Sequence, residues 1–221
     1  MKTAIITGIS GQDGAFLSEL LLNKGYNVVG TSRTPEQANA FWRLDELGIR
    51  DHVKVINCQE REREAIAEFN PDEIYNLEGQ SSVAKSFESP FETIRSNGFS
   101  TLNWLDAIRT VNPAVKFYQA SSSEIFGTSE NFSRDERSYF HPRSPYAVSK
   151  LFSHCTTVNY REAYGIFGCC GILFNHESAL RGDQFVTQKI ARSVAEIKAG
   201  KLDCLSIGNL SAQRDWGHAR D

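Results

Sequence analysis

A tyrosine and a lysine stand four residues apart in the segment Tyr146-Ala147-Val148-Ser149-Lys150. On a helix, residues at i and i+4 lie on the same face, so the phenol and the ammonium are expected to be neighbours. A cation beside a phenol stabilises the phenolate and lowers its pKa from about 10 toward neutrality. Tyr146 is therefore a candidate general base that takes a proton from a hydroxyl during hydride transfer, and Lys150 is its candidate activator.

A second group of candidate residues, Ala120-Ser121-Ser122-Ser123-Glu124, follows an apolar run at residues 115–119. Hydroxyl groups at the carboxyl end of a strand face the ligand crevice of an open α/β sheet. The carboxylate of Glu124 adds a candidate proton acceptor to this position. Without the tyrosine, the same serine cluster would be typical of an ordinary turn or helix cap.

A glycine-rich segment, Gly8-Ile9-Ser10-Gly11-Gln12-Asp13-Gly14, lies between the first predicted strand and the first predicted helix. Glycines at this spacing allow a tight turn, a close approach to a pyrophosphate and close helix–strand packing. The N-terminus of the following helix offers free N–H groups and the positive end of its dipole to a phosphate. The segment therefore predicts a dinucleotide-binding turn.

The end of the second predicted strand indicates which dinucleotide binds. Sites that select NAD usually carry Asp or Glu there, to accept a hydrogen bond from the ribose 2′-OH. Here the residues are Gly30-Thr31-Ser32-Arg33, without an acid. Arg33 is suited to pair with the 2′-phosphate of NADP, with Arg43 as a candidate second cation. A solvated surface arginine is the alternative interpretation, and the sequence favours NADP.

The elements that must position these residues alternate along the chain. Strands are expected at residues 2–7, 27–31, 53–56, 73–77, 115–119 and 167–173. Helices are expected at residues 13–24, 36–47, 60–69, 91–110, 145–164 and 184–199. Repeated strand–helix alternation with right-handed crossovers predicts an α/β fold with a doubly wound, Rossmann-type parallel sheet.

Two parts of the chain are expected to differ in role. Residues 1–170 are predicted to form the NADP-binding domain, and residues 171–221 the incomplete start of a smaller substrate-binding lobe. The final segment, residues 213–221, is rich in residue types found at sites, which suggests a fragment of a longer protein. Residues 129–143 are polar without a clear period, so we expect a surface loop there.

Composition and charge bound the possible functions. The 221 residues carry a formal net charge of −3 and are 40% hydrophobic, which is typical of a globular protein and indicates no general affinity for nucleic acid or anionic membranes. No apolar run approaches the ~20 residues of a membrane span, and the N-terminal residues lack a signal-peptide pattern. The five cysteines form no CxxC pair and four of the five histidines show no ligand spacing. We therefore expect a cytoplasmic protein without a metal site.

Taken together, the motifs resemble the extended short-chain dehydrogenase/reductase family. Longer strings are similar to the GDP-mannose 4,6-dehydratases within it. These strings are Tyr75-Asn76-Leu77, Gln80-Ser81, Pro142-Arg143-Ser144-Pro145-Tyr146-Ala147, Asn159-Tyr160-Arg161-Glu162-Ala163-Tyr164-Gly165, Gly171-Ile172-Leu173-Phe174-Asn175-His176-Glu177-Ser178 and Arg214-Asp215-Trp216-Gly217-His218. The resemblance runs from residue 3 to residue 221.

The resemblance implies a lyase that converts GDP-mannose to GDP-4-keto-6-deoxymannose with a tightly bound NADP. Tyr146 then takes the proton from the sugar 4-OH while hydride leaves C4 for NADP⁺, and Lys150 holds the nicotinamide ribose. Glu124 removes the C5 proton as water leaves from C6, and hydride returns to C6. Ser122 stands where the family uses a hydroxyl hydrogen-bonded near O4.

Further contacts follow from the same resemblance. It implies that the cofactor is contacted by Leu77, Gly79, Gln80, Ser81, His176 and Arg181, and the GDP-sugar by Asn175, Lys189 and Arg214. The basic side chains among them suit a diphosphate. A homodimer or homotetramer is also expected.

Several residues depart from the family pattern. Ser82 replaces a histidine, Ala179 replaces a proline, and three more departures lie near the predicted cofactor. Cys58 lies in a segment that replaces an acidic turn after the third strand, Glu78 adds a carboxylate, and Glu92 replaces an aromatic contact. These changes favour a paralogue with a related substrate, for which a GDP-manno-heptose 4,6-dehydratase is the first candidate. The same residues are also compatible with a non-catalytic nucleotide-sugar-binding protein and with a simple 4-keto-sugar reductase.

Overall fold

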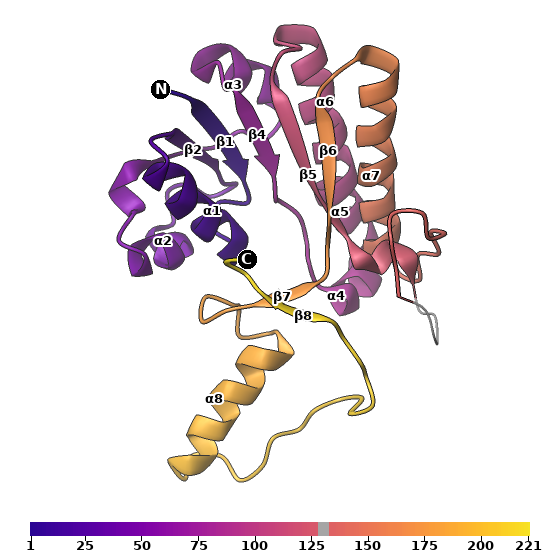
Figure 1. Ribbon diagram of the computed structural model, residues 1–221. Coiled ribbons are helices and arrows are strands. Elements are labelled where there is room, and N and C mark those ends of the chain that lie inside the picture. Colours follow the sequence, from indigo (N-terminus) through magenta and orange to yellow (C-terminus); the bar gives the residue numbers. More distant parts are fainter. Residues whose placement is uncertain (128–132) are drawn as a thin grey trace. The chain divides into compact units, whose positions relative to one another are not determined.

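The computed structural model describes residues 1–127 and 133–221, and it forms two compact units (Figure 1). The first unit is Met1–Leu173 and the second is Phe174–Asp221. The division falls three residues beyond the expected limit at residue 170, because β6 (Gly168–Leu173) completes the sheet of the first unit. Of the predicted loop at 129–143, residues 129–132 lie outside the described residues, and residues 133–143 contain no helix or strand.

Within the described residues, six parallel strands form the sheet of the first unit. The strands are β1 (Thr3–Thr7), β2 (Asn27–Thr31), β3 (Val53–Ile56), β4 (Glu73–Asn76), β5 (Lys116–Ser122) and β6. Their order is β3-β2-β1-β4-β5-β6, so the direction of the connections reverses between β1 and β4. The predicted doubly wound sheet is confirmed, and ligands of such sheets bind at this reversal, outside the carboxyl ends of the strands.

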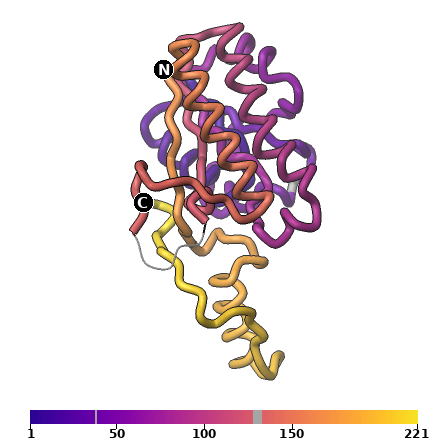
Figure 2. The backbone as a smooth tube through the Cα atoms, turned by 90° about the vertical axis from the view of Figure 1, so that its right-hand side faces the viewer, coloured from indigo at the N-terminus to yellow at the C-terminus, as the bar shows by residue number. Residues whose placement is uncertain are grey.

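Helices cover both faces of this sheet (Figure 1 and Figure 2). The main ones are α1 (Gln12–Asn23), α2 (Trp42–Glu46), α3 (Glu62–Phe69), α6 (Ser100–Val111) and α7 (Pro145–Tyr164). Helices α1 and α2 pack together on one face, and α3, α6 and α7 pack side by side on the other, as right-handed crossovers require. A core of fully buried side chains, including Trp104, Ile108 and Phe117, lies between the sheet and α3 and α6.

The limits of α7 follow from its sequence. Ser144 caps its first turn by accepting a hydrogen bond from the Ala147 N–H at 3.1 Å, and Pro145 occupies the first helical position. Gly165 ends the helix in the left-handed conformation, at φ +69°. These signals fix the helix that carries the predicted tyrosine and lysine.

The helix predicted over residues 91–110 differs from expectation. It consists of α5 (Pro90–Ile94), a π-helical segment η3 (Arg95–Phe99) and α6, and it is preceded by an unpredicted helix α4 (Val83–Glu88). In the π-helical segment, the buried Asn97 side chain donates to Ser149 of α7 at 2.9 Å and to the Gln80 carbonyl at 3.2 Å. These tertiary hydrogen bonds accompany the wider turn.

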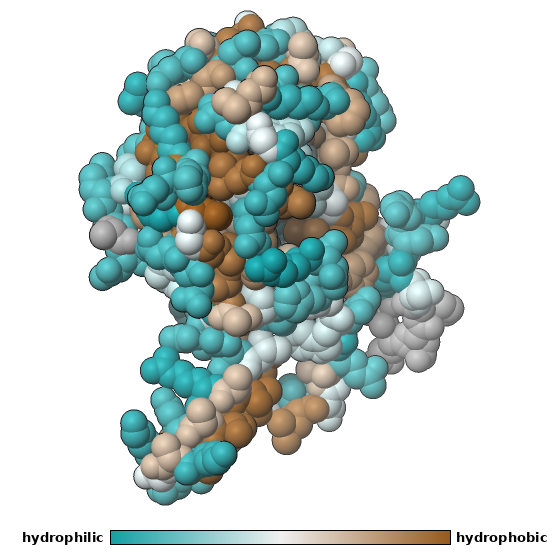
Figure 3. Space-filling view, turned by 60° about the vertical axis from the view of Figure 1, so that its left-hand side comes forward, coloured by the Kyte–Doolittle hydropathy of each residue, from teal (hydrophilic) through white to brown (hydrophobic). Residues whose placement is uncertain are grey.

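The second unit pairs two strands of three residues, β7 (Asn175–Glu177) and β8 (Trp216–His218), in parallel. Its helix α8 (Val186–Lys198) lies within the predicted range 184–199. Figure 3 shows hydrophobic side chains gathered along this helix. Val186, Ile190, Val194 and Ile197, spaced on one helical face, are all exposed. The helix therefore presents an apolar stripe of the kind that usually packs against another segment or chain.

A buried network of polar side chains joins the carboxyl ends of three strands in the first unit. The Thr7 hydroxyl of β1 donates to the side-chain oxygen Oδ1 of Asn76 at 2.7 Å, and the Asn76 side-chain amide donates to Gln119 of β5 at 2.8 Å and to Thr101 of α6 at 3.1 Å. The four residues are at most 1% exposed. Each buried polar group thus has a partner, as a low-dielectric interior requires.

We expect Asn76→Ala to lower the free energy of unfolding by about 3 kcal/mol, because it leaves three buried partners short of a hydrogen bond. Asn23→Ala, at an exposed position of α1, is the control and is expected to stay within about 0.5 kcal/mol of the wild type. Chemical denaturation followed by circular dichroism measures both. Equal losses in the two variants would contradict a structural role for the network.

Candidate active site

The glycine turn between β1 and α1 has the tight geometry predicted for it. Gly8 adopts φ +67°, and the Gly11 N–H donates to the Gly8 carbonyl at 2.9 Å. A Cβ atom added to Gly8 would lie 3.0 Å from the backbone of Glu78, and one added to Gly14 would lie 2.6 Å from the Gly8 carbonyl oxygen. Gly11 caps α1 without a side-chain hydrogen bond, which leaves the helix N-terminus suited to a phosphate. The turn therefore fits the pyrophosphate of a dinucleotide.

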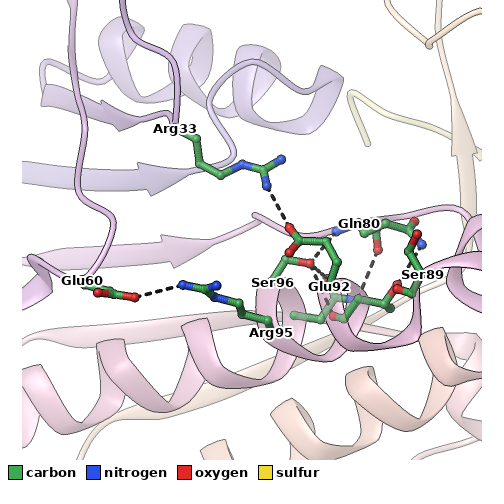
Figure 4. A network of polar contacts seen from close by, with 9 residues as sticks. Arg33, Glu60, Gln80, Ser89, Glu92, Arg95 and Ser96 are labelled. Atoms are coloured by element: carbon green, nitrogen blue, oxygen red, sulfur yellow. Dashed lines mark hydrogen bonds and ion pairs between the residues drawn. The ribbon is translucent and has the colours of Figure 1, made fainter.

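The loop after β4 lies against this turn. Thr7 accepts hydrogen bonds from the N–H groups of Leu77 and Glu78, both at 3.0 Å. The Gln80 amide donates to the Ser82 carbonyl at 2.8 Å and to Thr93 of α5 at 3.2 Å (Figure 4). The predicted cofactor residues of this loop are thus held between β1 and α5.

Glu78 is the residue of this loop with the most altered acidity. Burial raises the pKa of its carboxyl from an ordinary value of 4.5 to about 7, and the charge of Glu62 adds to the effect. Ser100 of α6 donates a hydrogen bond to the carboxyl group. Burial also raises the pKa of Glu62 on α3. A carboxyl group that is partly protonated at neutral pH therefore lies beside the glycine turn.

The four predicted catalytic residues come from two neighbouring parts of the first unit. Helix α7, with Tyr146 and Lys150, packs against β5 and the short 3-10 helix η4 (Ser123–Phe126) that follows it. Ser122, the last residue of β5, accepts a hydrogen bond from the Glu124 N–H at 3.2 Å. The expected serine turn therefore begins only at residue 123, because Ser122 still pairs with Leu173 of β6. The structure thus brings the candidate catalytic groups to the carboxyl end of β5.

Tyr146 and Lys150 lie on one buried face of α7, with exposed fractions of 9% and 6%. The Lys150 amine donates to the Ala120 carbonyl at 2.9 Å and lies 6.0 Å from the centre of the Tyr146 ring. Burial lowers the pKa of Lys150 from 10.5 to about 8, while the charges of Asp13 and Glu78 raise it. The amine therefore stays mainly protonated at neutral pH, under the influence of two acids beside the glycine turn.

The two arginines predicted near the cofactor have different surroundings. Arg33, two residues beyond β2, forms an ion pair with Glu92 of α5 at 3.0 Å, and both side chains are largely exposed. Arg43 donates to the Ser10 carbonyl in the glycine turn at 2.8 Å, and its guanidinium lies 4.5 Å from the centre of the Trp42 ring. In this structure Arg43 supports the turn, and Arg33 is the exposed cation at the end of β2.

The remaining predicted residues belong to the second unit. Asn175 pairs with Trp216 between β7 and β8, and His176 Nδ1 lies 2.7 Å from the Phe174 carbonyl. Arg181 forms an ion pair with Glu177 at 3.3 Å and lies over the Phe185 ring. Lys189 and Arg214 interact with the carbonyl groups of Ser206 and Gln213. Three of the basic side chains predicted to bind the cofactor or the GDP-sugar, Arg181, Lys189 and Arg214, thus belong to the second unit.

Sequence reasoning missed one residue beside the catalytic candidates. His154 of α7 lies with Nδ1 3.1 Å from the hydroxyl of Ser121, and its ring meets Phe140 edge to face. Burial lowers the pKa of His154. The spacing 146, 150, 154 was the signal in the sequence, because positions four apart continue the same helical face.

The fold and the glycine turn define a Rossmann-type protein with a dinucleotide-binding turn, and comparison with known proteins defines its family. The family model of GDP-mannose 4,6 dehydratase matches residues 5–221. The chain therefore belongs to the GDP-mannose 4,6-dehydratase family, which confirms the resemblance found in the motifs.

The curated relatives are close in sequence and longer than this chain. A GDP-mannose 4,6-dehydratase of Vibrio cholerae serotype O1 is 47% identical over 231 residues, which cover 100% of this chain and 62% of that protein. A GDP-mannose 4,6 dehydratase of Homo sapiens is 45% identical over 234 residues, with the same two coverages. The chain thus spans about 62% of the length of these relatives.

Solved structures share the fold at lower identity. A UDP-glucuronic acid 4-epimerase of Bacillus cereus, in complex with UDP-glucuronic acid and NAD, matches with a TM-score of 0.83 and 21% identity, over 98% of this chain and 69% of that one. DesIV, a dTDP-glucose 4,6-dehydratase of Streptomyces venezuelae with NAD and TYD bound, matches with a TM-score of 0.83 and 19% identity, over 98% and 68%.

Two features are absent from residues 1–127 and 133–221. No helix there is long and apolar enough to cross a membrane. No group of three or more His, Cys, Asp or Glu side chains in these two ranges is placed to hold a metal ion.

Glu78 makes the stability of the protein depend on pH. Between about pH 4.5 and pH 7 the folded protein keeps the Glu78 proton that the unfolded chain releases, so the free energy of unfolding falls by about 3 kcal/mol as the pH rises. We expect Glu78→Gln to remove this contribution to the pH dependence of the free energy of unfolding. The variant is therefore expected to be more stable than the wild type at pH 8. Urea unfolding across this pH range tests the expectation, with the exposed Glu68→Gln as control. If the free energy of unfolding changed equally with pH in the wild type and in Glu78→Gln, the expectation would be wrong.

Proposed function

We propose that this protein catalyses the NADP-dependent 4,6-dehydration of a GDP-sugar, GDP-mannose to GDP-4-keto-6-deoxymannose. The observation that carries the proposal is the packing of α7, which carries Tyr146 and Lys150, against β5 and η4, which carry Ser122 and Glu124. Relatives at 45–47% identity are named GDP-mannose 4,6-dehydratases. Because the chain spans only part of their length, the activity is proposed for the protein to which these residues belong. We expect it in the cytoplasm.

The cofactor proposed for the first unit is NADP. Two structural neighbours were solved with NAD bound, and the arginine at the end of β2 in place of an acid favours a 2′-phosphate here. The residues proposed to contact it, as the family resemblance implies, are Gly8, Ile9, Ser10, Gly11, Gln12, Asp13, Arg33, Leu77, Gly79, Gln80, Ser81, Tyr146, Lys150, His176 and Arg181. When bound, the nicotinamide supplies the acceptor and later the donor of one hydride, so no net cofactor is consumed.

The protein side chains supply the proton transfers. Tyr146 takes the proton of the sugar 4-OH as C4 becomes a ketone, and Ser122 holds O4 by a hydrogen bond. The ketone acidifies the C5 hydrogen, which Glu124 removes as a proton and passes to the C6 hydroxyl group, so that this group leaves as water. When hydride is returned to C6, Tyr146 gives its proton to C5, so the sugar loses one water in total and both side chains regain their starting protonation states. A simple reductase has no use for Glu124 in this position.

Lys150 is proposed to assist Tyr146 by its charge. Its ammonium lies 6.0 Å from the Tyr146 ring and is held by the Ala120 carbonyl, so its position is fixed before substrate binds. In a buried site, a fixed cation stabilises a developing phenolate more strongly than it would in water.

The second unit is proposed to contribute to the binding of the GDP-sugar through Asn175, Lys189 and Arg214. Lys189 and Arg214 are exposed and suit the negative charge of a diphosphate. A heptose in place of mannose would keep the same nucleotide contacts, so both GDP-sugars belong in the assay.

We expect Tyr146→Phe to abolish formation of the 4-keto sugar while folding and NADP binding are retained. The substitution removes only the phenol oxygen, which accepts the proton in its phenolate form, and the ring still fills its buried position. The assay incubates the purified protein with GDP-mannose or GDP-manno-heptose and follows the base-labile keto product. Native mass spectrometry measures bound nucleotide and its 2′-phosphate.

Val148→Ala is the matched control for this experiment, because Val148 lies on the exposed face of the same helix. It is expected to keep wild-type turnover. Unchanged turnover in Tyr146→Phe would refute the proposed mechanism. Binding of GDP-sugar without any product from the wild type would instead identify a non-catalytic paralogue.

The proposed oligomer is a homodimer or homotetramer. Support comes from exposed phenylalanines on the neighbouring elements α4, α5, η3 and α7, which together are called the aromatic patch: Phe87, Phe91, Phe99 and Phe152. The rings of Phe99 and Phe152 meet edge to face at 6.4 Å. Exposed aromatic clusters of this kind mark protein–protein contacts in soluble proteins.

We expect Phe87→Asp to shift the protein from oligomer toward monomer, because it places a charge in the aromatic patch. Phe87 is 63% exposed, so the folded monomer tolerates the change. Leu20→Asp on α1, which packs on the other face of the sheet, is the control and leaves the assembly intact. Size-exclusion chromatography with light scattering measures the mass. A monomeric wild type, or an unchanged oligomer in Phe87→Asp, would contradict this assignment.

A further inference from the structure

An ion pair joins the two sides of the predicted cofactor crevice. Arg33 follows β2, and Glu92 belongs to α5, which follows β4. In the sheet, β1 lies between these two strands, so the 3.0 Å pair bridges the segments on either side of the glycine-turn strand (Figure 4). A second pair of 3.0 Å, between Arg95 of η3 and Glu60 beyond β3, runs in the same direction.

The carboxylate of Glu92 is carried by a well-anchored helix. Its neighbour Thr93 is fully buried and accepts a hydrogen bond from Gln80, and the Gln80 N–H in turn points to Ser96 at 3.4 Å. The position of α5 is therefore tied to the loop that is predicted to line the cofactor. The Glu92 side chain itself is 51% exposed, and that of Arg33 is 72% exposed, so both remain open to a ligand.

The two charges favour different nucleotides. The guanidinium of Arg33 suits the 2′-phosphate of NADP, which carries nearly two negative charges at neutral pH. A carboxylate next to it repels that phosphate, and it competes for the same guanidinium. In other dinucleotide sites, an Asp or Glu carboxylate at the end of the second strand accepts a hydrogen bond from the free ribose 2′-OH of NAD.

We propose that Glu92 is a cofactor-specificity residue, which supplies from α5 the acid missing at the end of β2 and lets the site take NAD as well as NADP. The inference rests on the proposed nicotinamide binding but not on the proposed reaction. It assigns opposite roles to the two members of one ion pair: Arg33 selects for the 2′-phosphate and Glu92 selects against it.

The test measures dissociation constants of NADP and NAD for the purified protein by isothermal titration calorimetry. The wild type is expected to bind both within about tenfold of each other. Glu92→Gln, which keeps the shape of the side chain, is expected to raise the NADP-to-NAD affinity ratio about tenfold, with NADP bound more tightly and NAD more weakly. Arg33→Ala is expected to lower the same ratio by a similar factor.

Glu68→Gln is the matched control, because Glu68 forms an equally exposed ion pair with Lys54 between α3 and β3, outside the network of Figure 4. It leaves the ratio unchanged. A ratio within twofold of wild type in Glu92→Gln, or equal gains for both nucleotides, overturns the specificity role while nicotinamide binding stands. Failure of the wild type to bind either nucleotide overturns this inference together with the proposed cofactor.

Discussion

The hydrogen-bonded side chain of Asn76 is the constraint on which the arrangement of the site depends. It joins β1, through Thr7, to β5, through Gln119. Thr7 immediately precedes the glycine turn and also holds the loop after β4, while the Gln119 amide donates to the same Ala120 carbonyl that receives the Lys150 amine. One buried network thus links the strand that precedes the predicted cofactor turn to the carbonyl group that holds Lys150 of α7.

This rigid placement explains the electrostatics of the site. Burial of the Lys150 amine disfavours its charge, and the acids Asp13 and Glu78 compensate for part of that cost from the glycine turn and the loop after β4. The compensation is mutual, because the charge of Lys150 also lowers the pKa of Glu78, against the larger effect of burial. Glu78, which has no explanation in the sequence pattern, therefore belongs to the charge balance around Lys150.

The sequence predicted the elements whose signals are local. The strand at 27–31 and the helix at 145–164 have the predicted limits, since glycine, proline and apolar spacing mark their ends. Features that depend on distant partners were not predictable. The π-helical turn accompanies hydrogen bonds of Asn97 to α7, and β5 extends to Ser122 because β6 pairs with it. Strands β7 and β8, with three residues each, are too short to show a period. The sequence showed which residue types could act in catalysis. The lowered pKa of Lys150 could not be predicted, because it depends on the burial of the amine in the folded protein.

Three of the departures from the family pattern, at Cys58, Glu78 and Glu92, lie in one region of the first unit. Burial raises the pKa of the Cys58 thiol to about 12, with further contributions from Glu62 and Glu78, so Cys58 and Glu78 share one environment. Glu92 is linked to the same region by its ion pair with Arg33. The backbone carbonyl of Arg33 in turn lies 3.5 Å from the side-chain amide of Asn57, next to Cys58. All three changes thus lie around the ends of β2, β3 and β4, whereas the four residues proposed for chemistry lie at β5 and α7. These three changes are therefore separate in the fold from the elements β5 and α7 that carry the candidates for proton transfer.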